Sequence, residues 1–352
     1  MSKTLIVTGS SGLIGSEVVS YFSDRGFKVV GIDNNQREYF FGPSGSTVWN
    51  RDRLKKSYPN FVAIDVDIRD YQKIEAVVSS SKPYAVVHAA AQPSHDRASA
   101  IPFDDFTTNA NGTLNLLEAV RHHCPSAPFI YLSTNKVYGD RPNSMELTEG
   151  ETRWEFANLA DRSGISENCS VDQSMHSLFG VSKLSADLMV QEYGRYFGLR
   201  TCCLRGGCLT GANHSGVELH GFLSYLVRCN IKQEKYIVHG YKGKQVRDNI
   251  DAFDVATFIE QFITFPRVAE VYNIGGGLEN SISLIEAFNK IEALSGKKMI
   301  WEYSSSARKG DHIVYYSDLT KIKGHYPDWE KTKNLDVIFE EIHKSWLKRL
   351  TS

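Results

Sequence analysis

The glycine-rich segment near the start of the chain carries the clearest chemical signal. It follows an apolar run at residues 5–7 and precedes helically spaced apolar residues at 17–22. A glycine turn between a strand and a helix lets a pyrophosphate approach the backbone N–H groups at the helix N-terminus. The segment therefore predicts a dinucleotide site, with a tight turn that binds no ligand as the alternative. The residues expected to contact the dinucleotide are Gly9, Gly12, Leu13, Ile14 and Gly15.

A carboxylate follows at the distance expected for a ribose-binding residue. Asp33 ends the second apolar run, eighteen residues after Gly15, close to the spacing of about 20 residues in dinucleotide-binding folds. Such a carboxylate binds an adenosine ribose and repels a 2′-phosphate, so NAD is favoured over NADP, although Arg37 could pair with a phosphate. Asn34 is expected in the same pocket. A solvated loop position is the alternative for Asp33.

The third apolar run ends in a second acidic residue, Asp67, followed by Ile68. This carboxylate could accept a hydrogen bond from the adenine amino group, and the isoleucine could pack on the ring. Capping of the following helix is the competing role for Asp67, and it is more natural for Asp70.

The elements that must position these residues alternate between short apolar runs and helical patterns. The runs with strand character are 5–7, 29–32, 61–64, 85–88, 129–132 and 201–204. The segments with helical spacing of apolar residues are 17–22, 71–78, 112–119 and 184–197. This alternation predicts an α/β fold, a Rossmann-type doubly wound parallel sheet.

The composition excludes several classes of partner. The chain has 352 residues, 40 basic and 41 acidic, with a formal net charge of -1. No overall field therefore attracts nucleic acid or an anionic membrane, and no stretch approaches the about 20 apolar residues of a membrane span. The six cysteines form no C-x-x-C pair, which favours a reduced, cytoplasmic setting.

Three further segments complete a family pattern: 88–92 (HAAAQ), 109–118 (NANGTLNLLE) and 133–139 (STNKVYG). With the glycine segment, they make nearly the whole chain resemble the extended short-chain dehydrogenase/reductases, in particular the nucleotide-sugar epimerases and dehydratases. The resemblance implies a small-residue turn beneath the cofactor and polar residues beside it. The positions that it adds to the cofactor site are Ala89, Ala90, Gln92, Asn109, Ser133 and Lys183.

The resemblance assigns Thr134 the hydrogen bond to the reacting sugar hydroxyl. Without the family, Thr134 is a β-favouring residue at a strand end. Sugar-nucleotide dehydratases of this type carry an acid pair immediately after that hydroxyl, where this chain has Asn135 and Lys136. Because neither side chain is a carboxylate, oxidation followed by re-reduction is favoured over dehydration, which indicates an epimerase.

Phe179 occupies the position at which the family carries its catalytic tyrosine, four residues before Lys183. Phenylalanine cannot accept the proton that a sugar hydroxyl loses as hydride leaves, whereas Lys183 can still bind the nicotinamide ribose. An active chain therefore needs another base, and Lys136 is the first candidate because burial beside a cation would depress its pKa. Weaker candidates are His95, His176, Cys208 and His214. The sequence leaves open whether Phe179 is natural or an engineered replacement.

The downstream half resembles the substrate-binding part of the family. Arg247, in 240–248 (GYKGKQVRD), and Arg308, in 308–311 (RKGD), match the arginines that meet the substrate pyrophosphate, and two arginines suit two phosphates. Solvated surface charges are the alternative. Lys136 and Cys208 are also expected near the substrate.

The resemblance also implies a division into two lobes. We expect residues 1–204 to be mainly the NAD-binding domain, with an insertion loop at 139–177 near the active site. We expect residues 205–352 to be mainly a smaller, interleaved nucleotide-sugar lobe, with 246–277 returning to the first domain. A homodimer would pair the helices at 112–119 and 184–197, whose apolar residues could equally serve only the core.

Three segments favour one branch of the family: 133–142 (STNKVYGDRP), 151–154 (ETRW) and 204–211 (LRGGCLTG). They resemble the CDP-paratose and CDP-tyvelose 2-epimerases, which implies oxidation and hydride return at C2 of a CDP-linked dideoxyhexose. A UDP-sugar epimerase or decarboxylase is the enzymatic alternative. A nucleotide-sugar binding protein that traps its ligand without turnover is the alternative from another class.

Overall fold

The computed structural model describes residues 3–218, 220–307 and 310–351. The chain forms two compact units. The first contains Met1–Val137, Leu178–Arg205 and Val255–Tyr272, and the second contains Tyr138–Ser177, Gly206–Asp254 and Asn273–Ser352. The stretch that returns to the first unit is therefore shorter than the expected 246–277. The functional division into a cofactor lobe and a substrate lobe stays a prediction.

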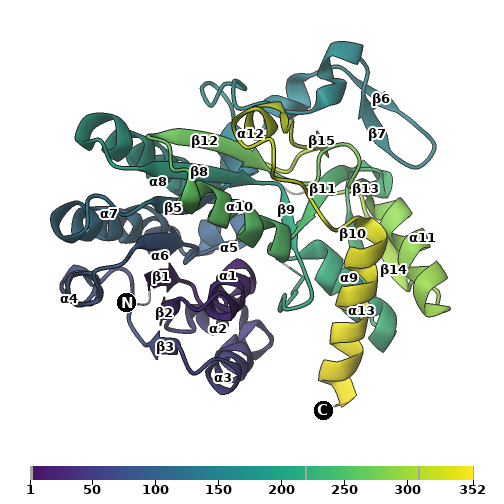
Figure 1. Cartoon of the computed structure of the whole chain (residues 1–352). Coiled ribbons are helices and arrows are strands. Elements are labelled where there is room, and N and C mark those ends of the chain that lie inside the picture. Colours follow the sequence, from purple (N-terminus) through teal and green to yellow (C-terminus); the bar gives the residue numbers. More distant parts are fainter. Residues whose placement is uncertain (1–2, 219, 308–309, 352) are drawn as a thin grey trace. The chain divides into compact units, whose positions relative to one another are not determined.

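A seven-stranded sheet in the order β12-β8-β5-β4-β1-β2-β3 forms the centre of the first unit (Figure 1). Its strands are β1 (Thr4–Thr8), β2 (Lys28–Ile32), β3 (Phe61–Ile64), β4 (Ala85–His88), β5 (Phe129–Thr134), β8 (Thr201–Gly206) and β12 (Glu270–Ile274). The pairs from β3 to β5 are parallel. The order reverses at β1, so the loops after β1 and β4 meet at the switch point where such sheets bind ligands. The predicted doubly wound α/β fold is confirmed.

Helices cover both faces of this sheet. In Figure 1, α4, α7 and α8 lie on one side of the strands, and α1, α3 and α10 lie on the other. The helices of this unit are α1 (Leu13–Asp24), α2 (Gln36–Phe41), α3 (Val48–Ser57), α4 (Tyr71–Ser81), α5 (His95–Ala100), α6 (Pro102–Phe106), α7 (Gly112–His123), α8 (Ser177–Phe197) and α10 (Ala252–Thr264). A 3₁₀ turn, η1 (Pro43–Gly45), follows α2, and a π-helical turn, η2 (Thr107–Asn111), precedes α7.

The apolar core between the sheet and three of these helices explains their positions. Ile74 of α4, Leu116 of α7 and Val190 of α8 are fully buried against strand residues such as Ile6 and Tyr131. Each fully buried side chain of this size contributes roughly 1.5–3 kcal/mol. The carboxyl ends of the strands are thereby held at one edge of the sheet, where the predicted site residues lie.

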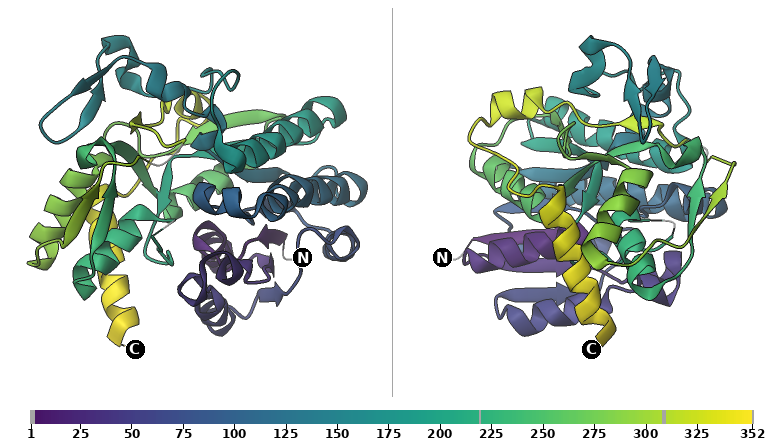
Figure 2. Two further views of the ribbon diagram at one scale, coloured as in Figure 1. Left: turned by 180° about the vertical axis from the view of Figure 1, so that it is seen from behind. Right: turned by 90° about the vertical axis from the view of Figure 1, so that its right-hand side faces the viewer.

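The second unit is built around β11 (Val246–Asp251). This strand pairs with β9 (Cys208–Thr210), β13 (Ser281–Ser283) and β15 (Val314–Tyr315). A separate parallel pair joins β10 (Tyr236–His239) to β14 (Trp301–Ser304). The helices are α9 (Phe222–Lys232), α11 (Leu284–Ser295), α12 (Thr320–His325) and α13 (Leu335–Thr351). Figure 2 shows α13 in yellow, running to the C-terminus.

The polar segment 139–177 contains regular structure. It holds the antiparallel hairpin of β6 (Leu147–Glu149) and β7 (Trp154–Phe156), and the 3₁₀ turns η4 (Arg141–Ser144) and η5 (Leu159–Ser163). Another 3₁₀ turn, η3 (Asn135–Tyr138), precedes it, and η6 (Tyr241–Gly243) lies before β11. The hairpin is attached to the start of α11, where the Ser283 hydroxyl donates to the Thr152 carbonyl at 2.7 Å. No helix among the residues described is long and apolar enough to cross a membrane.

Candidate active site

The glycine loop after β1 is packed so tightly that only glycine fits at two positions. A Cβ on Gly9, whose φ is 64°, would lie 2.7 Å from the Ala90 nitrogen, and a Cβ on Gly15 would lie 2.0 Å from the Gly9 oxygen. The N-cap of α1 is Gly12, which has no side chain to satisfy the first N–H groups of the helix. The loop therefore forms a cradle in which the first N–H groups of α1, which have no intrahelical acceptor, can meet a dinucleotide pyrophosphate.

Two residues that the sequence analysis missed support this cradle. Gly31 of β2 makes room for the loop, because a Cβ there would lie 2.6 Å from the Ser10 hydroxyl oxygen. Asn50 of α3 is fully buried and donates its side-chain N–H to the Ser11 carbonyl at 3.0 Å. The segment that contains Asn50 has no apolar periodicity, so nothing in its pattern pointed to this residue.

Asp33 lies beside the cradle and is fixed by backbone groups. One carboxylate oxygen accepts the Ser11 N–H at 2.9 Å, and the other accepts the Asn35 N–H at 2.8 Å. Burial raises the pKa of Asp33, and these two N–H donors oppose the shift. Asn34 accepts the Gln36 N–H at 3.3 Å. The arrangement suits a carboxylate that receives ribose hydroxyls, a role that stays a prediction.

Asp67 is engaged by Arg69 at the end of β3. The closest approach is 2.7 Å between a guanidinium nitrogen and the carboxylate. Burial alone would raise the pKa of Asp67, but hydrogen bonds from Arg69 outweigh it and lower the pKa. Asp70 caps α4 by accepting the Lys73 N–H at 3.2 Å, as predicted. Ile68 is buried against Gly112, where a Cβ would lie 2.6 Å from its side chain.

The turn after β4 is held by a buried amide. Asn109 accepts the Gln92 N–H at 2.9 Å and donates to the Gln92 carbonyl at 3.1 Å. Its side-chain N–H groups also approach Asp105 at 3.1 Å and the Ser182 hydroxyl at 3.0 Å. The sequence-predicted residues Gln92 and Asn109 thus meet, and Ser182 joins them to α8.

Lys183 is buried on the inner face of α8, with only 4% of its surface exposed. Its ammonium donates to the Leu132 carbonyl at 2.7 Å and lies 4.2 Å from the centre of the Tyr131 ring. Burial lowers the pKa of Lys183 to about 7, although Asp187 and Asp105 oppose the shift. At neutral pH the amine at the carboxyl end of β5 is therefore only partly protonated.

A buried ion pair fixes the neighbouring strand end. Asp187, one turn after Lys183 on α8, accepts the Ser133 hydroxyl at 2.6 Å and pairs with Arg205 at 2.8 Å. Both charged side chains are almost fully buried. Because breaking such a pair leaves an uncompensated charge, removal of one partner costs about 3–5 kcal/mol. The pair holds Ser133, and with it the strand end that carries Thr134, against α8.

The predicted reacting groups lie where β5 ends and α8 begins. The hydroxyl of Thr134 is half-buried and accepts the Lys136 N–H at 3.2 Å. Lys136 is half-buried in η3. Phe179 is 7% exposed and lies on the buried face of α8, one turn before Lys183. At this position the chain offers an apolar ring where a tyrosine would offer a hydroxyl.

The weaker candidates have other contacts. His95 lies 3.3 Å from the carboxylate of Asp96, and the His176 ring nitrogen lies 2.9 Å from the Ser174 carbonyl. His214 lies in the second unit, 3.4 Å from His220. These contacts identify no substitute base.

The predicted phosphate-binding residue Arg247 lies on β11 in the second unit. Its guanidinium donates to Asp311 at 2.7 Å, to the Val246 carbonyl at 2.7 Å and to the His312 carbonyl. Cys208 lies on β9, in register with Asn249, the second residue after Arg247 on the adjacent strand. Arg308 lies outside the described residues.

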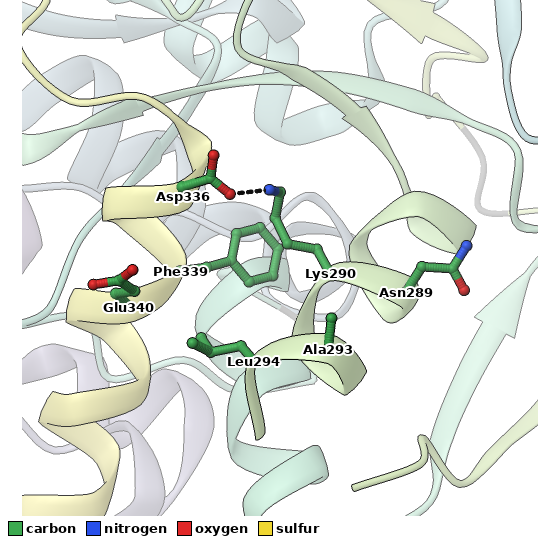
Figure 3. A pocket seen from close by; sticks show the side chains of 7 residues that line it. All are labelled: Asn289, Lys290, Ala293, Leu294, Asp336, Phe339 and Glu340. Carbon is green, nitrogen blue, oxygen red and sulfur yellow. Dashed lines mark hydrogen bonds and ion pairs between the residues drawn. The ribbon is translucent and has the colours of Figure 1, made fainter. Parts of the chain in front are cut away.

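A cavity of about 500 Å³ in the second unit contains none of the predicted site residues (Figure 3). It lies between α11 and α13, where Lys290 and Asp336 form an ion pair across its edge. The residues that line it are Asn289, Lys290, Ala293, Leu294, Asp336, Phe339 and Glu340. No acid–base pair or nucleophile in this set indicates a catalytic role.

The sheet order, the glycine cradle and the buried lysine define a dinucleotide-binding protein of the Rossmann class. Residues 5–275 match the model of the NAD-dependent epimerase/dehydratase family, and the chain belongs to this family. Its cofactor is NAD, which the cradle fits.

Similar proteins include an epimerase and a dehydratase. CDP-paratose 2-epimerase from Salmonella typhi is 30% identical, and the alignment covers 92% of this chain and 94% of that protein. The structure of a dTDP-glucose 4,6-dehydratase from Bacillus anthracis in complex with NAD is 25% identical, with a TM-score of 0.77 and coverage of 99% and 97%. A UDP-glucuronic acid 4-epimerase from Bacillus cereus, at 22% identity and a TM-score of 0.80 with coverage of 98% and 99%, shares the fold.

Proposed function

We propose that the chain is an NAD-dependent nucleotide-sugar epimerase that inverts C2 of a CDP-linked dideoxyhexose by transient oxidation and hydride return. The observation that carries the proposal is the strand end at Thr134, where Asn135 and Lys136 replace the acid pair expected of a dehydratase. Without a carboxylate there, loss of water lacks its general acid and base. The similarity to CDP-paratose 2-epimerase supports the choice of CDP and of C2.

The described side chains suggest a division of roles. Bound NAD supplies a hydride acceptor and donor. Thr134 donates its hydroxyl hydrogen to the reacting sugar oxygen, and the remaining N–H groups of Lys183 bind the nicotinamide ribose. Arg247 binds the substrate pyrophosphate, in exchange for part of its pairing with Asp311.

The proton released from the sugar hydroxyl needs an acceptor other than Phe179. We assign this role to Lys136, which follows Thr134 by two residues and is half-buried. The cationic nicotinamide of bound oxidised NAD would favour a neutral amine beside it, and a neutral amine can accept a proton. Replacement of Lys136 by methionine should abolish turnover and leave NAD binding intact. Unchanged turnover would eliminate Lys136 as the base.

The proposed function is tested by NMR in deuterated water, with the purified protein, NAD and a panel of CDP-, UDP- and GDP-sugars. The expected result is a new C2 epimer of a CDP-sugar without deuterium on carbon, because the hydride returns directly. A product only from a UDP-sugar would overturn the CDP assignment. Deuterium at the inverted carbon would contradict hydride return.

Phe179 itself favours a second candidate, a nucleotide-sugar binding protein that does not turn its ligand over. Its cofactor cradle is complete, whereas the position of the acid–base hydroxyl is apolar. Tight binding of a CDP-sugar with no product in the NMR experiment would support this candidate. Turnover that is absent from the chain and appears only in Phe179→Tyr would support it further.

We also propose a homodimer through the exposed face of α8. Four apolar side chains recur along this face at helical spacing: Leu178, Val181, Leu188 and Tyr196, with exposures of 49%, 45%, 44% and 83%. An exposed apolar stripe of this kind marks an interaction surface. Sedimentation should give a dimer for the chain and a monomer after Val181→Glu with Leu188→Glu. A monomeric parent chain would contradict the proposal.

A further inference from the structure

His88 ends β4 and is almost fully buried, with 1% of its surface exposed. Its two ring nitrogens each meet a threonine: Nδ1 lies 2.7 Å from the Thr8 hydroxyl, and Nε2 lies 2.9 Å from the Thr113 hydroxyl. These three residues come from β1, β4 and α7, so the imidazole joins the ends of β1 and β4, at the switch point of the sheet, to α7.

The neighbouring hydrogen bonds fix which nitrogen carries the proton. The Thr113 hydroxyl donates its one hydrogen to the Asn109 carbonyl at 2.6 Å, so towards His88 its oxygen accepts, and Nε2 must be protonated. The Thr8 oxygen accepts the Ala90 N–H at 3.2 Å, which leaves its own hydrogen for Nδ1. A neutral ring protonated on Nε2 satisfies every one of these groups.

The contacts close into a ring around the turn after β4. The path runs from the Ala90 N–H through Thr8, His88 and Thr113 to Asn109, whose side chain bonds both backbone groups of Gln92. Ala90 is the residue whose nitrogen a Cβ on Gly9 would meet at 2.7 Å. Asn109 also bonds Ser182, the residue before Lys183.

We propose that His88, as the neutral Nε2–H tautomer, is a positioning residue for the NAD site. It holds the turn of Ala89–Gln92 in register with the glycine loop and with the helix that carries Lys183. A second proton on the ring, or rotation of the ring, would set two donors or two acceptors against each other at Thr8 or Thr113. Burial and the charge of Lys183 keep the pKa of His88 well below its ordinary value, which maintains the neutral form.

The first test reads the tautomer in the intact protein. Histidine labelled with ¹⁵N should give, for His88, one protonated and one unprotonated ring nitrogen, with the proton on Nε2 throughout the range in which the protein is folded. The signal is assigned by its absence from His88→Gln. A ring protonated on Nδ1, or on both nitrogens, would overturn the inference.

The second test separates positioning from simple structural support. Thr113 and Thr201 are both fully buried, and each donates its hydroxyl to a backbone carbonyl: Thr113 to that of Asn109 at 2.6 Å, and Thr201 to that of Val190 at 2.9 Å. Thr201 lies outside the ring of contacts. Thr113→Val should weaken NAD binding by about tenfold, the size of one lost buried hydrogen bond, measured by calorimetry. Thr201→Val should leave NAD affinity unchanged. Thr113→Ser keeps the hydroxyl and should bind NAD as tightly as the parent chain does.

Each outcome decides the question. Equal NAD affinities for Thr113→Val and Thr201→Val would show that the ring of contacts supports the core but does not position the NAD site. Failure of Thr113→Ser to restore affinity would show that the hydroxyl is not the group that matters. Both results can be read without turnover, so they are independent of the substrate and of the effect of Phe179.

Discussion

The cofactor cradle and the acid–base position on α8 lie in the same unit but differ in completeness. The cradle has close-packed glycines, a buried Asp33 with two N–H partners and a turn fixed by Asn109. One turn before Lys183, the acid–base position holds the apolar ring of Phe179. From this difference we infer that the chain keeps the means to hold NAD, whereas the position expected for the proton acceptor is apolar.

The largest expected effect concerns the cradle. In Gly15→Ala the new Cβ would lie 2.0 Å from the Gly9 oxygen, so the loop must move, and NAD affinity should fall at least about 100-fold. The measurement is calorimetric titration with NAD. Gly324→Ala is the matched control, because it also lies in a helix and its Cβ would meet no atom within 4 Å. Unchanged NAD affinity in Gly15→Ala would contradict the proposal that the close-packed glycine loop binds NAD.

The second prediction concerns Lys183 without NAD. Its folded-state pKa of about 7 lies below the ordinary 10.5, so between these values the unfolded chain binds more protons, and stability rises with pH. Between about pH 7 and pH 9, the free energy of unfolding of the chain should rise by about 2 kcal/mol relative to that of Lys183→Met. Urea unfolding of both proteins measures this gain. Parallel stability curves would show that the amine is not desolvated.

The third prediction concerns the second unit. There the proposed phosphate contact is the side chain of Arg247, whereas the cradle in the first unit uses backbone N–H groups. Arg247→Gln should weaken binding of CDP by about tenfold, because a charged pair of hydrogen bonds to phosphate is lost. NAD affinity should stay unchanged. Arg195→Gln serves as the control, since that side chain is 52% exposed and pairs with Glu192 and Gln191 of its own helix. Equal CDP affinity in both variants would remove Arg247 from the substrate site.

The smallest expected effect tests whether Asn50 of α3 supports the glycine loop. Asn50→Ala removes the bond to the Ser11 carbonyl and should lower NAD affinity about fivefold. Asn230→Ala removes a comparable buried bond, to the Lys297 carbonyl at 2.9 Å, and should leave NAD binding unchanged. Thermal unfolding should show that both variants lose stability. If Asn230→Ala also lost NAD affinity, the loss in Asn50→Ala would be a consequence of lower stability and not of the missing bond to Ser11.

Much of the fold and the cradle could be predicted from the sequence, because their signals are local. Apolar runs gave the strands, and the spacing of three glycines gave the loop. The start of α8 was missed: apolar periodicity indicated 184–197, whereas the helix is Ser177–Phe197. The buried face at its start includes the polar Ser182 and Lys183, which interrupt the apolar period because they serve the site.

The contacts that complete the site could not be predicted, because they join residues far apart in the sequence. Asn50 supports Ser11 across 39 positions, and Asn109 meets Ser182 across 73. The engagement of Asp67 by Arg69 needs side-chain geometry that spacing does not provide. The role of His88 likewise emerges only when both of its threonine partners are in place.

We propose that NAD binding is intact although the proton acceptor expected at position 179 is missing. The most direct measurement compares the chain with Phe179→Tyr for NAD affinity and for epimerisation of CDP-paratose. We expect the two proteins to bind NAD equally. We expect Phe179→Tyr to epimerise faster by about 10²- to 10⁴-fold, the usual contribution of a general base. An unchanged rate, or NAD binding that appears only with tyrosine, would contradict the proposal.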